Sequence, residues 1–179
     1  MKKIIVAGGL AAAALLAPLA VAGTASAAPA PVAKATGSVT WNFNHSQVTG
    51  TVTFDANNKT GGTLDYQASN GMWLHGVVTP GSYQKIDAHT AIFSGTITTA
   101  SSDVYLTTNP NGAFFTAKVV DGGAPQDGHG DMIAVLNNQV VPGTWITSAT
   151  DTAARAATIA YPMDAAHAGI VNSGNLTIN

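Results

Sequence analysis

The 179-residue sequence contains no cysteine and no glutamate, and only 9% of its residues are charged. Without cysteine, the chain has neither a disulfide framework nor a thiol for a lipid anchor. Its nine acidic residues are all aspartate, and the few lysines and arginines lie singly along the chain beyond the N-terminus. This distribution excludes the basic patch that nucleic-acid binding requires. Thr, Ser, Asn and Gly take the place of the Glu and Lys of surface helices, which favours strands and turns.

The N-terminus has the three parts of an export signal. Residues 1–3 are positively charged, residues 4–22 are apolar and rich in alanine, and Ala25-Ser26-Ala27 has the pattern that signal peptidase accepts. We therefore expect residues 1–27 to be a signal peptide, with Ala22 as the other candidate cleavage point, and the mature protein to be secreted and extracellular. No basic stop-transfer cluster follows, so no membrane span is expected after cleavage.

The mature chain has the size of one domain. Residues 28–35 are rich in Ala and Pro and predict a short extended linker, and residues 36–179 predict a single β domain. A domain of this size buries about 70% of the surface of its unfolded chain, which is enough for a core without disulfides. After signal removal five cationic and nine acidic side chains remain, so the secreted domain is mildly acidic.

Apolar and polar residues alternate along most of the mature chain. Val39, Trp41 and Phe43 share one face of a first strand, and Val52 and Phe54 share one face of the next. Further strands are expected at residues 64–68, 72–79, 84–88, 90–98, 103–107, 113–120, 132–136, 140–146, 158–161, 166–171 and 175–178. Turn sequences rich in Gly, Asn and Pro separate them.

This pattern predicts an all-β fold. Our first choice is an antiparallel β-sandwich of about ten short strands, and a barrel is the second choice. Residues 151–157 are the exception, because Asp151 is placed to cap a short Ala-rich helix there; helix and irregular loop are equally compatible with the sequence. A repeat of fixed period is not present, which argues against a solenoid or propeller.

Three of the nine aspartates fall within the Gly-rich segment 121–131. Its glycines allow backbone angles that bring carboxylates and carbonyl oxygens together, and Ca²⁺ takes six to eight oxygen ligands. Asp121, Asp127 and Asp131 are therefore the candidate ligands of a calcium site. The spacing does not match an EF-hand, and the alternative is a strand connection in which Asp121 and Asp131 bond turn amides.

Histidines and aromatic residues offer weaker candidates. The histidines form no recognised zinc spacing, so we interpret them as surface or turn residues; they are His45, His75, His89, His129 and His167. Exposed aromatic side chains on a sheet face can stack on sugar rings, and the candidates are Trp41, Trp73, Trp145, Tyr66 and Tyr105. Trp41 lies in phase with Val39 and Phe43, which favours a place in the core.

Motifs of common enzyme classes are missing from the sequence. It has no Gly-x-Ser-x-Gly elbow and no phosphate or dinucleotide loop, and two-carboxylate glycoside hydrolysis would have to use Asp in both roles. We therefore predict a non-catalytic binding or structural module with an unknown extracellular partner. The alternative is an extracellular hydrolase that acts on polysaccharide or cell wall through Asp pairs, with His129 nearby.

Segments of the C-terminal half carry a family resemblance. Residues 115–125, residues 130–135 and the closing Gly174-Asn175-Leu176-Thr177-Ile178 resemble a β-rich domain family of secreted proteins from high-GC Gram-positive bacteria. In that family, an F-x-V-x-V-x-D-x-G-x-P-G-x-G-D run joins two strands and a G-N-I-x-I strand closes the domain. Here Ala124 replaces the acid before the proline, and residues 140–170 lack a clear counterpart. The resemblance implies an exported, sandwich-like domain and no established activity.

Overall fold

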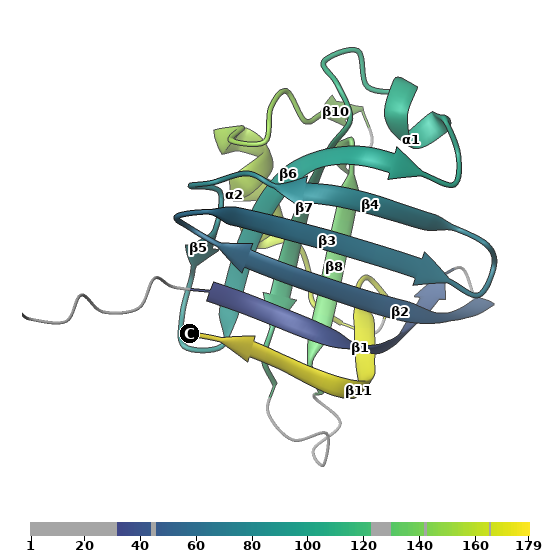
Figure 1. The fold of residues 1–179 in the computed structure, drawn as a ribbon, viewed down its shortest axis with the longest axis vertical. Coiled ribbons are helices and arrows are strands. Elements are labelled where there is room, and N and C mark those ends of the chain that lie inside the picture. The colour runs from purple at the N-terminus through teal and green to yellow at the C-terminus, as the bar shows by residue number, and fades with distance from the viewer. Residues whose placement is uncertain (1–31, 44–45, 123–129, 142, 165) are drawn as a thin grey trace, which may run out of the picture.

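The computed structural model describes residues 32–43, 46–122, 130–141, 143–164 and 166–179, and within them the chain is mostly β (Figure 1). The strands are β1 (Val32–Phe43), β2 (Ser46–Asn57), β3 (Gly61–Ala68), β4 (Trp73–Val78), β5 (Gln84–Lys85), β6 (Thr90–Ala100), β7 (Phe114–Val120), β8 (Met132–Asn137), β9 (Gln139–Val141), β10 (Thr144–Trp145) and β11 (Gly169–Ile178). The helices are α1 (Val104–Thr107) and α2 (Thr152–Ala160). Neither helix has the length and apolar character needed to cross a bilayer.

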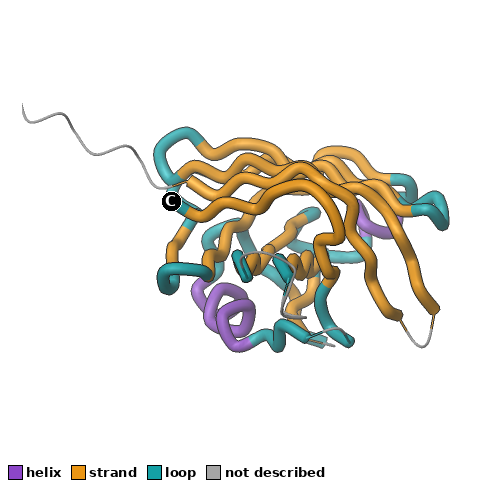
Figure 2. The backbone as a smooth tube through the Cα atoms, turned by 90° about the horizontal axis from the view of Figure 1, so that it is seen from below, coloured by secondary structure: helices purple, strands orange, loops and turns teal. Residues whose placement is uncertain are grey.

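Eight of these strands form a closed antiparallel barrel. Neighbours pair in the order β4-β3-β2-β1-β11-β8-β7-β6, and β6 pairs back with β4 to close it. The short β5 continues beside the other end of β6, and β9 and β10 form a separate two-stranded sheet. Figure 2 shows the strands arching over the interior. The all-β prediction is confirmed, and the barrel, our second choice, is the arrangement that forms. Closure removes the free edges that a sandwich would leave.

The barrel closes through the two ends of the described chain. β1 pairs with β11, with Ala33 opposite Ile178, and Ala33 is completely buried. The strand therefore begins inside residues 28–35, where we expected a linker. Ala33 packs into the core cluster, so residues 32–35 belong to the barrel.

Aromatic side chains fill the centre of the barrel. The ring centroids of Phe54 and Phe93 are 5.1 Å apart, and those of Phe93 and Phe115 are 6.3 Å apart in an edge-to-face arrangement. A Cβ atom at Gly76 or Gly95 would lie only 2.6 or 2.8 Å from the Phe115 ring. These two glycines therefore make room for the ring where β4 and β6 meet.

Helix α2 covers the outside of β7. The Asp151 carboxylate accepts hydrogen bonds from the backbone N–H groups of Ala153 and Ala154, so of our two alternatives for residues 151–157 the capped helix is the one that forms. The helix runs further than expected, and the strand predicted at 158–161 is wrong. Thr158 is buried on the same helix face as Ala154, and its hydroxyl lies 3.0 Å from that of Thr116 on β7.

Residues 103–107 form the single turn of helix α1 instead of the predicted strand. The hydroxyls of Thr107 and Thr108 donate to the carbonyls of Asp103 and Val104, which competes with strand pairing. Residues 140–146 split into β9 and β10, with Gly143 in a left-handed conformation between them (φ 85°). Residues 169–178 form one strand, β11, where we expected two.

Candidate functional site

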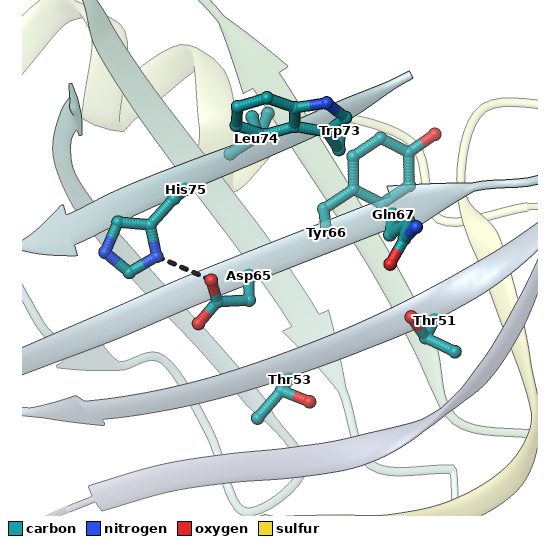
Figure 3. A pocket seen from close by; sticks show the side chains of 8 residues that line it. All are labelled: Thr51, Thr53, Asp65, Tyr66, Gln67, Trp73, Leu74 and His75. Carbon is teal, nitrogen blue, oxygen red and sulfur yellow. Dashed lines mark hydrogen bonds and ion pairs between the residues drawn. The ribbon is translucent and has the colours of Figure 1, made fainter. Parts of the chain in front are cut away.

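An open groove of about 430 Å³ lies on the outer face of β2, β3 and β4 (Figure 3). Its lining consists of Thr51, Thr53, Asp65, Tyr66, Gln67, Trp73, Leu74 and His75. The odd-numbered members face outward because their even-numbered neighbours, such as Val52 and Leu74, fill the barrel interior. Alternation along three adjacent strands thus places polar groups and one indole ring on a single surface.

Strand register orders the outward side chains into two rows. One row runs from Thr53 through Asp65 to His75, and each member lies directly opposite the next on neighbouring strands. The second row runs from Thr51 through Gln67 to Trp73. Directly opposite side chains in a sheet lie close enough to interact, so each row acts as a short ladder of hydrogen-bonding groups.

Asp65 and His75 form the strongest polar contact in the groove. The Nδ1 atom of His75 lies 2.5 Å from Oδ1 of Asp65 (Figure 3). Because an ionised carboxylate only accepts hydrogen bonds, Nδ1 is the donor and the ring orientation is fixed. Both side chains are partly exposed, so the Nε2 edge of the imidazole and the second carboxylate oxygen remain near solvent.

Trp73 provides the apolar surface of the groove. It is 41% exposed, which is unusual for the largest apolar side chain. Its backbone is held on both sides by Ser101: the Trp73 N–H donates to Ser101 Oγ at 3.0 Å, and the Ser101 N–H donates to the Trp73 carbonyl at 2.9 Å. The indole therefore stands on a fixed stretch of strand at the start of β4.

The neighbouring Tyr66 behaves differently from Trp73. Its ring packs partly against the barrel core, and burial raises the pKa of its phenol to about 12. The nearby Tyr105 makes a smaller contribution in the same direction to this value. Tyr66 stays neutral and borders the groove, whereas Trp73 is exposed in it.

Most of this site was not predicted from the sequence. Trp73 and Tyr66 were among our aromatic candidates, but Asp65, Gln67 and the threonines were not. The signal that was available is the run of polar residues at outward positions of three successive predicted strands. Recognising it requires knowing that these strands are neighbours, which alternation alone does not establish.

The predicted calcium ligands flank the connection between β7 and β8. Asp121 directly follows β7 and Asp131 directly precedes β8, while Asp127 and His129 lie outside the described residues. The carboxylate of Asp131 accepts N–H groups from Gly122 at 3.2 Å and from Leu176 at 3.1 Å. Asp131 thus has the amide-bonding role that we considered as the alternative. In the part of the chain that is described, no group of three or more His, Cys, Asp or Glu is placed to hold a metal ion.

Burial raises the pKa of the Asp131 carboxyl, and the nearby charge of Asp121 acts in the same direction. The two backbone N–H groups partly offset this by stabilising the charged form. The Gly122 bond and the effect of the Asp121 charge place two of the three predicted ligands near each other, beside Leu176 of β11.

Other candidates are dispersed over the surface. His167 lies 2.7 Å from the carboxylate of Asp164, and its ring meets that of Tyr161 edge to face. The N–H of His89 donates to Asp87 in a turn, while His45 lies outside the described residues. The side chain of Trp41 is not described, so its predicted place in the core stays a prediction.

Comparison with known proteins adds no relative. No protein-family model, curated protein or solved structure matches the chain. The resemblance to a family of secreted bacterial β domains therefore stays a prediction from sequence motifs. What the protein does has to be argued from the geometry of its own surface.

Proposed function

We propose that this protein is an exported, non-catalytic binding module that holds a neutral polysaccharide in the groove around Trp73. The exposed indole beside fixed hydrogen-bonding groups is the observation that carries this proposal. A pyranose ring has a face of C–H groups and a rim of hydroxyls. Such a ring needs an apolar platform for its face and donors and acceptors for its rim, and the groove offers both.

The polar side chains of the groove match the rim of a sugar. Asp65 accepts hydrogen bonds from hydroxyls, and its charge makes those bonds stronger than neutral ones. Gln67, Thr51 and Thr53 supply both donors and acceptors from the adjacent strands. Because these side chains stand on strands of a closed barrel, little ordering is needed when the ligand binds.

The charge of the groove favours a neutral polymer. Asp65 is its carboxylate, and its lining includes no Lys or Arg. An acidic polysaccharide would bring negative charge next to Asp65 in a protein that already carries a net negative charge. Uronic-acid or phosphate-bearing polymers are therefore poorer ligands than uncharged glucans or N-acetylated sugars.

The single carboxylate also favours binding over cleavage. Glycosidases that use two carboxyl groups place them roughly 5–9.5 Å apart across the sugar. In the lining of the groove, Asp65 has His75 as its partner instead of a second acid. The hydrolase alternative therefore depends on Asp121 and Asp131, which flank the connection between β7 and β8.

Co-sedimentation with insoluble polysaccharides tests this proposal. The secreted protein is mixed with cellulose, chitin and an acidic polymer such as cross-linked pectate, and the unbound fraction is measured at increasing salt. We expect retention on one of the neutral polymers that persists at high salt, since stacking and neutral hydrogen bonds are little screened. Retention on the acidic polymer alone, lost at high salt, would contradict the proposal.

Calcium binding at Asp121, Asp127 and Asp131 stays a second prediction. It is favoured by the closeness of Asp121 and Asp131, because a cation there would offset the repulsion that raises the pKa of Asp131. Thermal unfolding with EDTA and with added Ca²⁺ tests it: a ligand that binds only the folded state must raise the midpoint. Asp121→Asn is the matched variant and should abolish the rise, whereas an unchanged wild-type midpoint would reject the site.

A further inference from the structure

A second cavity, of about 240 Å³, lies where β6 leads into α1 and β8 leads into β9. Figure 1 shows α1 and β10 on the same side of the barrel. Its lining includes Tyr105, Thr108, Asn137, Asn138, Gln139 and Trp145. These residues come from two separate parts of the chain, residues 105–108 and residues 137–145. Two aromatic rings and three side-chain amides thus meet in one small space, and none of its lining residues is charged.

Asn138 organises this cavity. Its backbone adopts a left-handed conformation (φ 61°), the only such non-glycine residue in the described part of the chain. Its side-chain N–H donates to the Tyr105 carbonyl at 2.7 Å, and its oxygen accepts from the Phe114 N–H at 3.0 Å. These two bonds fix helix α1 to the start of β7. Residues held in rare backbone conformations are common at ligand sites, because the surrounding structure must maintain them.

A second asparagine, Asn109, fixes the opposite side. Its buried side chain donates to the Ile146 carbonyl at 2.7 Å, directly after β10. Trp145 is therefore attached to the same turn that follows α1. Together the two asparagines set the spacing between Tyr105 and Trp145 independently of any ligand.

Asn137 leaves a hydrogen-bonding group unused. Its Oδ1 atom is buried and has no hydrogen-bond partner among the described residues. A buried acceptor without a partner costs about 1–3 kcal/mol, and such atoms are rare in folded proteins. The terminal torsion of asparagine rotates readily, so this oxygen can turn toward the cavity and accept a hydroxyl or N–H of a bound molecule.

We propose that this cavity is a second binding site, which takes one ring of a neutral sugar between Tyr105 and Trp145 with a hydroxyl or N-acetyl N–H on Asn137. The uncharged lining excludes an ionic ligand, and a volume below the roughly 300 Å³ of ordinary small-molecule pockets suits a single ring. The proposal rests on the proposed function for its ligand class. Residues 101 and 102 link the two sites, since Ser101 is bonded to Trp73 and the Tyr105 N–H donates to the Ser102 carbonyl.

Tryptophan fluorescence separates the two sites, because the chain has only three tryptophans. The variant with Trp41→Phe and Trp73→Phe keeps Trp145 as its sole indole, and the variant with Trp41→Phe and Trp145→Phe keeps Trp73. Each is titrated with the same soluble probes, a six-unit gluco-oligosaccharide and a six-unit N-acetylglucosamine oligomer. In the variant that keeps only Trp145, we expect a saturable change of Trp145 emission with one of these probes. Because this variant lacks the Trp73 indole, the change would report binding at the second cavity.

The outcomes distinguish this inference from the proposed function. A response of Trp73 without one of Trp145 overturns the second site and leaves the groove. A response of Trp145 alone supports the second site and contradicts the groove, and silence of both contradicts both.

Asn137→Leu provides an independent test in the Trp145-only protein. Removing an unsatisfied buried acceptor should leave the unfolding midpoint unchanged or raise it, while binding weakens by about tenfold. A purely structural asparagine would not change the affinity, so unchanged binding in this variant would contradict the assigned role of Asn137.

Discussion

Three aspartates of this protein each have a different structural role. Asp151 caps helix α2, Asp131 accepts two backbone N–H groups, and Asp65 orients His75 in the groove. The cap could be anticipated because it depends on neighbours two and three positions along the chain, and bonding of turn amides by Asp131 was our alternative to calcium binding. The bond from the Leu176 N–H to Asp131 and the contact of Asp65 with His75 depend on strand pairing, which sequence spacing does not reveal.

Replacing Asp151 by Ala should destabilise the protein by about 1 kcal/mol, since the first helical N–H groups lose their acceptor. The bonds from the N–H and hydroxyl of Thr147 are lost as well. Urea unfolding measures the change. Asp103→Ala is the matched control, because Asp103 precedes α1 without a side-chain capping bond, and it should have little effect. Equal effects of the two variants would contradict the capping role.

The same carboxylate should make stability depend on acid pH. Hydrogen bonds from Thr147 and from the helix N-terminus lower the pKa of Asp151 to about 2, from its usual 3.8. The stabilisation is therefore complete above pH 3.8 and disappears as the pH falls toward 2. The difference in unfolding free energy between wild type and Asp151→Ala should shrink over this interval. A difference that stays constant down to pH 2 would show that the cap does not depend on ionisation.

At the scale of whole elements, one lysine side chain connects strand β7 to the C-terminal end of helix α2. The Lys118 ammonium on β7 donates to the carbonyls of Ile159 and Tyr161 at 2.6 and 2.8 Å, where helix α2 ends. These carbonyls lie at the negative end of the helix dipole, so the cation is favourably placed. Period-2 alternation predicted β7 well, but it could not reveal that a helix would end on its outer face.

Lys118→Met should cost about 1 kcal/mol, because two helix carbonyls lose a charged donor that is partly exposed to water. Lys59→Met is the control, since Lys59 is exposed in the β2–β3 turn. Chemical denaturation of both variants measures the difference. If Lys59→Met lowers the unfolding free energy as much as Lys118→Met does, the role of Lys118 at the end of the helix is contradicted.

Barrel closure between β4 and β6 should be sensitive to one added methyl group. In Gly95→Ala the new Cβ would collide with the Val77 carbonyl oxygen and lie 2.8 Å from the Phe115 ring, so we expect a loss of about 3 kcal/mol. Gly71→Ala meets no atom within 4 Å and should cost about 1 kcal/mol through its positive φ alone. Thermal unfolding ranks the two, and equal losses would show that the Phe115 contact is not tight.

The strands form a barrel because β1 pairs with β11 and β4 pairs with β6. Composition and alternation predicted an all-β antiparallel domain, but the choice between sandwich and barrel depends on pairings such as Ala33 with Ile178 and Gly76 with Ile97. These are long-range pairings that no local pattern specifies. The same limit applies to the candidate site, which exists only because β2, β3 and β4 are neighbours.

The predicted export concerns the whole chain. It is tested by expressing the protein in bacteria and measuring the mass of the protein recovered from the medium. We expect a mature chain that begins at Ala28, or at Gly23 if the cut follows Ala22. Either start lies before Val32 and leaves β1 intact. Ala27→Arg should block the first cleavage, because the peptidase requires a small residue there. Full-length protein retained inside the cells in the wild type would contradict the export prediction.

The most direct test of the central claim is the affinity of Trp73→Ala for the neutral polysaccharide that retains the wild-type protein, measured as the bound fraction at increasing amounts of polymer. Truncating an aromatic anchor at the centre of a binding site typically costs about 2 kcal/mol, so a loss of tenfold or more is expected. Val77→Ala, a change at another exposed apolar residue on the same strand, should bind as the wild type does. Circular dichroism confirms that both variants are folded. Undiminished binding by folded Trp73→Ala would contradict the account.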